Sequence, residues 1–269
     1  MAETPETKYG TAWSRDELVL ALSLYCQIPF AQTKAGNAEV IGLARLLGRT
    51  PSSVARKLGN FGAFDPLLAQ KGIVGLAHFS KADEQIWGEF YGRWDALVEE
   101  CQKLFAERGE SVPFVMEKEG ESAPRLPTTL SLPTGPTVQA RLVSTRLTQS
   151  FFRRAVLSSY RNACCLCGLD LPQMLVASHI KPWAVSEEAR ADPENGLCLC
   201  ALHDKAYDRG LLSVTAAYQV VVSPAVRRSK AAFTEVLLGA FDKQPIQMPS
   251  RFAPKAKYLQ WHLEYVFQA

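Results

Sequence analysis

The sequence predicts an α+β protein with a mostly helical N-terminal domain, a linker and a zinc-stabilised C-terminal domain of short strands and helices. Apolar residues recur every three or four positions within residues 1–109, as in amphipathic helices. Residues 110–140 contain five prolines among Ser, Thr, Gly and Glu and show no period. Residues 141–269 follow the order strand, loop, strand, helix and contain paired cysteines and a histidine with the spacing of zinc ligands.

Length and composition exclude several classes of protein. The chain has 269 residues, enough for one large domain or two ordinary ones at roughly 100–200 residues each. With 47% apolar and 21% charged residues it can bury a core. No apolar run reaches the ~18–20 residues that cross a bilayer, and the start MAETPETKYG lacks a secretory signal, so we expect a cytoplasmic protein. In that reducing compartment the seven cysteines are metal ligands or buried thiols rather than disulfides.

The charge is unevenly divided along the chain. Residues 1–140 hold 14 Lys and Arg against 17 Asp and Glu, whereas residues 141–269 hold 16 against 10. The C-terminal half therefore carries a net charge of +6, which modestly favours a polyanionic partner there.

Local signals predict the first helices. Ser14 and Glu17 have the spacing of a capping box, so a helix should begin at Arg15 and end before Pro29. A second helix should begin after Asn37 and end at Gly48.

Two further helices are predicted before the linker. One begins with Thr50 as N-cap and Pro51 in the first helical position. Ser80 should cap a single long helix that runs to Gly109, because apolar residues keep a spacing of three or four up to Leu104.

The second and third helices resemble a helix-turn-helix, a module found ahead of nuclease domains. The third would then be the recognition helix, with outward polar and basic side chains that suit DNA phosphates and base edges. These candidates are Ser52, Ser53, Arg56, Lys57 and Asn60. An ordinary helical hairpin with a solvated polar face is the alternative.

After residue 140 the pattern changes. The linker 110–140 is expected to contain at most a short strand near 114–116. Beyond it the sequence predicts a helix over 148–160, strands over 173–180 and 196–200, a helix over 201–208 and a hairpin through 211–223.

A Cys–Cys pair and a Cys–His pair predict a zinc site. Cys164-x2-Cys167 and Cys200-x2-His203 supply four ligands from two tight turns, as tetrahedral zinc requires. Cys165 and Cys198 leave the choice of ligand open, and we expect Cys198 to point away from Cys200. The alternative is a set of buried, unliganded thiols.

The segment ASHIKPWAVSEEARADPENGLCLCALHDKAYDRGL resembles the HNH endonuclease family, and the resemblance covers residues 141–222. His179, Asn195 and the His203-Asp204 pair match the order and spacing of the family motif. The resemblance implies a ββα-metal fold in which a histidine ends the first strand, an asparagine begins the second and the helix carries a metal ligand. His179 would be the general base, Asn195 would orient it, and one Mg²⁺ or Mn²⁺ ion would assist phosphodiester hydrolysis.

Two positions leave the metal ligands open. Family members commonly have Asp or His before the general base, whereas this chain has Ser178. His203 could bind the structural zinc, leaving Asp204 for the catalytic ion, or could itself bind the catalytic ion. We favour His203 on zinc.

The leading hypothesis is a metal-dependent endonuclease that cuts double-stranded DNA, and the resemblance implies a role in restriction or defence. The alternative is a non-catalytic, zinc-dependent DNA-binding regulator, and an RNA nuclease is a weaker third hypothesis. Because one HNH site cuts one strand, double-strand cleavage would need a homodimer or two events.

Overall fold

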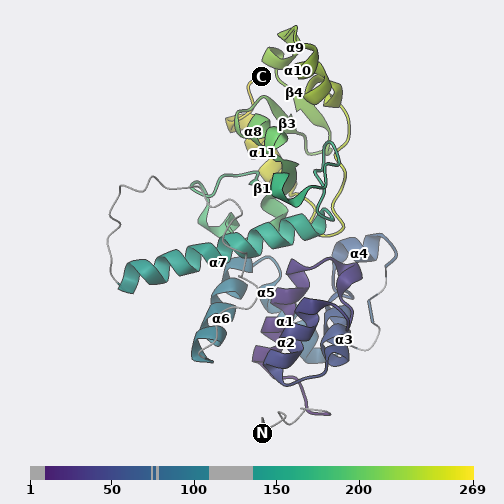
Figure 1. Cartoon of the computed structure of the whole chain (residues 1–269), viewed down its shortest axis with the longest axis vertical. Helices are drawn as coiled ribbons and strands as arrows, with labels where there is room; N and C mark the ends of the chain where they lie inside the picture. The colour runs from purple at the N-terminus through teal and green to yellow at the C-terminus, as the bar shows by residue number, and fades with distance from the viewer. Residues whose placement is uncertain (1–9, 74, 77–78, 109–135) are drawn as a thin grey trace. The chain divides into compact units, whose positions relative to one another are not determined.

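Figure 1 shows the computed structural model of the chain, which describes residues 10–73, 75–76, 79–108 and 136–269. The chain divides into two compact units, Met1–Phe151 and Phe152–Ala269. Helices dominate and two small two-stranded sheets complete the fold, so the predicted α+β class is confirmed. Within the described residues, no helix has both the length and the apolar character needed to cross a membrane.

The N-terminal unit is helical. Its elements are α1 (Arg15–Gln27), η1 (Phe30–Gln32), α2 (Ala38–Leu47), α3 (Pro51–Phe61), α4 (Pro66–Gln70), α5 (Lys81–Phe90), α6 (Trp94–Glu107) and the first part of α7 (Pro136–Ser159). Helix α1 packs against α2, α3, α5 and α6. Because neighbours cover α1 on several sides, its apolar residues surround the helix instead of forming one stripe.

The predicted starts of the first three helices are confirmed. The Ser14 side chain accepts a hydrogen bond from the Glu17 amide at 3.3 Å, and Glu17 accepts one from the Ser14 amide at 2.9 Å. Helix α2 ends at Gly48, whose φ of 66° only glycine adopts without strain. The Thr50 side chain caps α3 by accepting from the Ser53 amide at 3.2 Å.

The single long helix predicted from Ser80 to Gly109 is wrong. Two helices, α5 and α6, occupy this stretch, and they are separated at Tyr91–Arg93. Gly92 has a φ of 79°, which turns the chain sharply. The apolar spacing continues across the break because α5 and α6 both pack on α1.

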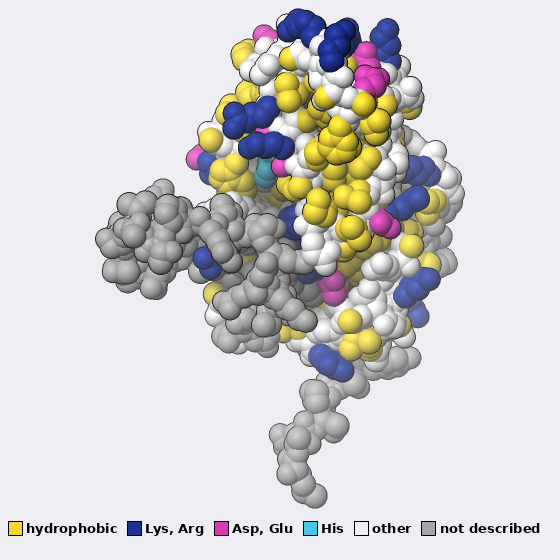
Figure 2. Space-filling model, turned by 45° about the horizontal axis from the view of Figure 1, so that its top comes forward, with side chains coloured by type: hydrophobic (Ala, Val, Ile, Leu, Met, Phe, Trp, Pro, Cys, Tyr) yellow, Lys and Arg dark blue, Asp and Glu magenta, His cyan; other side chains and the backbone are white. Residues whose placement is uncertain are grey.

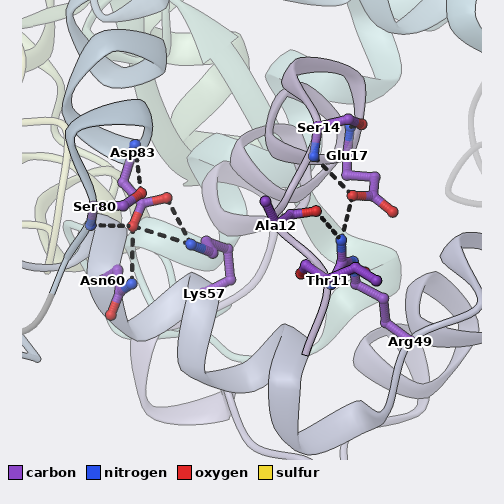
Figure 3. A network of polar contacts seen from close by, with 9 residues as sticks. All are labelled: Thr11, Ala12, Ser14, Glu17, Arg49, Lys57, Asn60, Ser80 and Asp83. Carbon is purple, nitrogen blue, oxygen red and sulfur yellow. Dashed lines mark hydrogen bonds and ion pairs between the residues drawn. The ribbon is translucent and has the colours of Figure 1, made fainter. Parts of the chain in front are cut away.

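The expectation that Lys57 and Asn60 point outward is also wrong (Figure 3). Their side chains turn toward α5, where Lys57 Nζ lies 2.8 Å from Asp83 Oδ1 and Asn60 donates to Asp83 Oδ2 at 2.9 Å. Lys57 and Asn60 are buried, and Asp83 is 0% exposed. Burial alone would raise the pKa of Asp83, but the hydrogen bonds from Lys57, the Ser80 amide and Asn60 lower it below its usual value. A buried carboxylate needs such partners, so Lys57 and Asn60 turn inward although the α3 sequence predicts a solvated polar face.

Helix α7 begins earlier than predicted. The sequence placed residues 136–140 in the linker and the helix start at Thr148, whereas the helix runs from Pro136 to Ser159. Pro136 is the first helical residue, where the missing N–H removes no intrahelical bond. The short strand expected near Phe114 and the rest of the linker to residue 135 lie outside the described residues.

The C-terminal unit contains the two sheets. Strands β1 (Leu175–His179) and β2 (Gly196–Cys200) pair antiparallel with His179 opposite Gly196, and α8 (Ala201–Asp208) follows directly. Strands β3 (Leu212–Val214) and β4 (Val220–Val222) form the predicted hairpin. The remaining elements, which the sequence analysis did not anticipate, are η2 (Pro172–Met174), η3 (Glu187–Ala189), η4 (Pro193–Asn195), α9 (Pro224–Arg228), α10 (Ala232–Leu237), η5 (Gly239–Phe241) and α11 (Ala256–Tyr265).

Close packing sets α7 against β2. A Cβ atom added at Gly196 would lie 2.3 Å from Val156 Cγ2 and 3.0 Å from Phe152 Cζ. Only glycine therefore allows the C-terminal turns of α7 to reach the start of the strand that follows Asn195.

Candidate functional site: a Cys3His cluster beside a buried histidine

Four predicted ligands meet at one point. Cys164, Cys167, Cys200 and His203 each bring one ligand atom within 4.8 Å of the others. His203 Nδ1 lies 3.2 Å from Cys200 Sγ and 3.6 Å from Cys164 Sγ, and the Sγ atoms of Cys167 and Cys200 lie 4.0 Å apart. Three sulfurs and one imidazole nitrogen are a donor set that zinc prefers, so this group could hold zinc.

Local backbone geometry presents these ligands. The Cys164 amide donates to the Leu169 carbonyl, and Gly168 closes the turn with a φ of 75°. The Cys165 amide donates to the Cys198 carbonyl at 2.8 Å, which ties the turn to β2. Cys165 and Cys198 are 1% and 0% exposed, lie in the apolar core and are not part of the ligand group. All seven cysteines are free thiols.

The orientation of His203 suits a metal ligand. Its Nε2 lies 2.8 Å from the Leu237 carbonyl, which can only accept, so Nε2 carries the proton and Nδ1 keeps its lone pair toward the sulfurs. Burial and the neighbouring Cys164 and Cys200 sulfurs raise the pKa of the Cys167 thiol. A cation is what would stabilise three thiolates so close together.

His179 lies at the end of β1 in a partly buried position. Its Nε2 lies 3.1 Å from the Arg190 carbonyl, and its ring stacks on Phe152 with centroids 3.6 Å apart. Burial lowers the pKa of His179, so the imidazole is neutral at pH 7. Because the Arg190 carbonyl can only accept a hydrogen bond, Nε2 carries the proton, and Nδ1 holds the lone pair that a base requires.

Asn195 joins the two ends of the loop that follows His179. It is 0% exposed, its Oδ1 accepts from the Lys181 amide at 2.8 Å, and its Nδ2 donates to the carbonyls of Lys181 at 2.9 Å and Ala189 at 3.2 Å. Lys181 follows the histidine by two residues, and Ala189 precedes the carbonyl acceptor Arg190. The side-chain amide thus fixes both ends of the loop around the imidazole ring.

Asp204, the residue after His203, lies near Ser178. Burial raises the pKa of Asp204, the Ser178 hydroxyl lowers it, and the charge of Asp208 raises it further. Ser178 is 3% exposed, so its hydroxyl is one of the few polar groups near this carboxyl group. A buried hydroxyl beside a carboxyl group in an unfavourable environment fits a divalent cation with oxygen ligands.

The polar start of α3 forms a separate pocket in the N-terminal unit. It has a volume of about 410 Å³ and is lined by Gly10, Thr11, Trp13, Arg49, Thr50, Ser52, Ser53 and Arg56. Ser52 and Arg56 are exposed and Ser53 is partly exposed. Three of the five predicted DNA-contacting residues therefore line one open pocket, whereas Lys57 and Asn60 are buried.

Sequence reasoning missed three contacts around the site. Nothing in the sequence indicated that Phe152 packs on the histidine ring. The Arg190 and Leu237 carbonyls that bind His179 and His203 carry no side-chain signal. Another histidine, His262, is buried between Ser213 and the Tyr207 carbonyl, away from this site.

The C-terminal unit has an antiparallel strand pair followed directly by a helix. A histidine ends the first strand, and the candidate metal ligands meet at the start of the helix. This is the arrangement of a ββα-metal domain. Comparison with family models then gives the family. Residues 164–215 match a model described as HNH endonuclease, so the predicted resemblance to this family is confirmed for this part of the chain. The family is generally one of nucleases that use divalent metals. No curated protein matches the chain.

Proposed function

We propose that the chain is a metal-dependent endonuclease that hydrolyses phosphodiester bonds in double-stranded DNA, with His179 as general base. The observation that carries the proposal is the neutral imidazole whose Nε2 lies 3.1 Å from the Arg190 carbonyl and whose loop Asn195 fixes. A structural zinc site needs neither residue. This pair therefore favours the nuclease over the alternative, a zinc-dependent DNA-binding regulator.

In the proposed reaction His179 Nδ1 takes a proton from the attacking water. The hydroxide forms a bond to phosphorus, and the bond from phosphorus to the 3′ oxygen breaks. Asn195 is a positioning residue, because it bonds only the backbone around the base. A lowered pKa keeps His179 in the accepting form at neutral pH.

Asp204 would hold the catalytic cation, with the Ser178 hydroxyl beside it. A bound Mg²⁺ or Mn²⁺ ion would supply Lewis-acid stabilisation of charge on the phosphate and on the departing oxygen. Cys164, Cys167, Cys200 and His203 would bind a structural zinc ion that fixes the start of α8, the helix that presents Asp204.

For the rest of the chain we propose residues 1–109 as a helix-turn-helix-like DNA-binding domain and 141–269 as the nuclease domain, with a linker after residue 109 that ends where α7 begins at Pro136. Ser52, Ser53 and Arg56 would contact DNA, because they line the open pocket at the start of α3. The HNH resemblance is the basis for proposing a role in restriction or defence, and cleavage of both strands would use a homodimer.

A plasmid-nicking assay tests the activity. The parent should convert supercoiled plasmid to nicked or linear forms with Mg²⁺ or Mn²⁺, and not after chelation. His179→Ala should lose roughly 10²–10⁴-fold in single-turnover rate while binding DNA normally. An exposed-residue control, Arg45→Gln on α2, should cut like the parent.

Two outcomes would contradict the proposal. A parent protein that binds DNA but cuts none with any divalent ion supports the regulator. A parent that degrades RNA faster than duplex DNA contradicts the proposed substrate.

A further inference from the structure

Helix α11 carries two stacked aromatic side chains, an exposed Tyr265 and a half-buried Trp261. The rings of Trp261 and Tyr265 lie 5.2 Å apart with an interplanar angle of 25°, and Tyr265 is 65% exposed. Four positions separate them, so they lie on the same face of the helix. His262 turns to the core and is 2% exposed. The stack therefore contributes an exposed aromatic surface that the packing of this unit does not require.

Lysines flank this aromatic stack. Lys257 lies one turn before Trp261 on the same face and is exposed, and Lys181 Nζ lies 6.0 Å from the centre of the Trp261 ring. Lys181 is also the residue whose backbone amide and carbonyl both bond Asn195. The aromatic stack thus lies beside the loop that leaves the general base His179.

Helix α11 is held firmly against that loop. Asp192 accepts hydrogen bonds from Lys255 Nζ at 3.1 Å and from the Tyr258 hydroxyl at 3.0 Å, and Lys255 Nζ lies 2.6 Å from Glu194. Asp192 lies three residues before Asn195 and Glu194 lies one residue before it. Polar contacts therefore join the helix that carries the stack to the loop that carries Asn195.

An aromatic surface between ammonium groups fits a ligand with a flat π face and a negative charge. A nucleotide has both, since its base stacks on aromatic rings and its phosphate binds lysine. In a closed duplex the neighbouring base pairs cover both faces of each base, so only an unpaired base can stack on a side chain.

Resting on the proposed nuclease function, we infer that Trp261 and Tyr265 stack on an unpaired base of the DNA bound at His179, while Lys181 and Lys257 contact its phosphates. The nuclease thereby favours duplexes that contain open bases over fully paired ones.

Binding titrations of the full-length, zinc-loaded protein test this inference. The probes are a labelled duplex and the same duplex with a central run of unpaired bases, without added divalent ion. Trp261→Ala and Tyr265→Ala should each weaken binding of the unpaired probe by roughly 5- to 150-fold and leave the paired probe little changed. Tyr265→Phe keeps the ring and should bind like the parent. Because Tyr265 is exposed, its substitutions should not unfold the unit.

Phe233→Ala is the matched control. Phe233 is 70% exposed and follows Lys230 by three residues, but it lies on α10. Figure 2 shows dark blue Lys and Arg side chains beside yellow hydrophobic ones at the end of the molecule where α9 and α10 lie. If aromatic exposure near cations were enough, this variant would lose the same affinity. We expect none.

The inference would be overturned if both alanine variants bound the unpaired probe as tightly as the parent does. It would also be overturned if they lost affinity equally for the paired and unpaired probes. Plasmid cleavage by the parent is measured separately. A parent that cuts, with variants that bind normally, contradicts only the stacking role. A parent that cuts no DNA contradicts the proposed function instead.

Discussion

The ring of Phe152 lies flat on the imidazole of His179, with centroids 3.6 Å apart and an interplanar angle of 9°. Phe152 comes from α7, and His179 ends β1. The contact removes one face of the imidazole from water, which disfavours its charged form. Burial thus keeps the base neutral although the hydrogen bond to the Arg190 carbonyl, which orients the ring, raises the pKa of His179.

This environment predicts the pH dependence of cleavage. The pKa of His179 lies below its usual value of 6.5, so the active neutral form persists as the pH falls below that value. The single-turnover rate should therefore fall to half of its maximum only below pH 6.5. A rate that halves near pH 7, measured with saturating DNA and metal ion, would contradict a buried histidine as the base.

Loss of the zinc ligands should unfold the C-terminal unit. Cys164→Ser or Cys167→Ser removes one thiolate, and in small zinc modules the binding free energy, on the order of 10 kcal/mol, is folding free energy. We expect insoluble or protease-sensitive protein beyond residue 141, with less than stoichiometric zinc by elemental analysis. Cys165→Ser serves as a control that alters a core thiol outside the cluster and should keep its zinc. Normal melting of both ligand variants would contradict the zinc site.

Substitutions of Arg56 and Lys57, two neighbouring cations on α3, should affect DNA binding and stability differently. Arg56→Gln removes an exposed charge at the pocket, so DNA binding should weaken and the log–log salt slope should flatten by about 0.9 for the lost phosphate contact. Its stability should change by no more than about 0.5 kcal/mol. An unchanged salt slope would return Arg56 to the solvated face of an ordinary helical hairpin.

Lys57→Met should instead lower the stability of the fold, because it leaves the Asp83 carboxylate buried without its counter-ion. Breaking a buried pair from one side costs roughly 3–5 kcal/mol of unfolding free energy. Denaturant unfolding of both variants checks the contrast. A Lys57→Met protein that is as stable as the parent would show that the remaining donors suffice for Asp83.

Buried His262 should make stability depend on pH. Burial lowers its pKa to about 4, whereas an unfolded histidine titrates near 6.5. Between these values the unfolded chain binds the proton and the folded chain does not, so the free energy of unfolding rises with pH across this window. In His262→Gln the slope should be shallower by up to one proton, measured by denaturant unfolding with zinc content followed in parallel. An unchanged slope would assign the pH dependence to other groups.

Much of the local structure could be predicted from the sequence. The caps at Ser14, Asn37 and Thr50 act within one helical turn, so their side chains and spacing predicted where helices begin. The ligand spacing of Cys164, Cys167, Cys200 and His203 likewise reflects two tight turns. The strand and helix bounds at 196–200 and 201–208 were predicted as the structure has them.

The errors came from interactions across the fold. Lys57 and Asn60 were predicted to point outward because the sequence of α3 does not indicate that Asp83, on another helix, needs their hydrogen bonds. The break at Gly92 was missed because both resulting helices bury the same apolar pattern against α1.

By itself the sequence determined the class of fold and the four candidate zinc ligands, because spacing along the chain fixes which side chains share a turn. Its resemblance to HNH endonucleases indicated His179 and Asn195. Tertiary structure alone decided which carbonyls bind His179 and His203, that Phe152 covers the imidazole, and that Trp261 lies beside Lys181. These contacts join segments far apart in the chain through backbone groups and ring faces. Every residue has a backbone carbonyl, so no residue type could reveal the partner before folding.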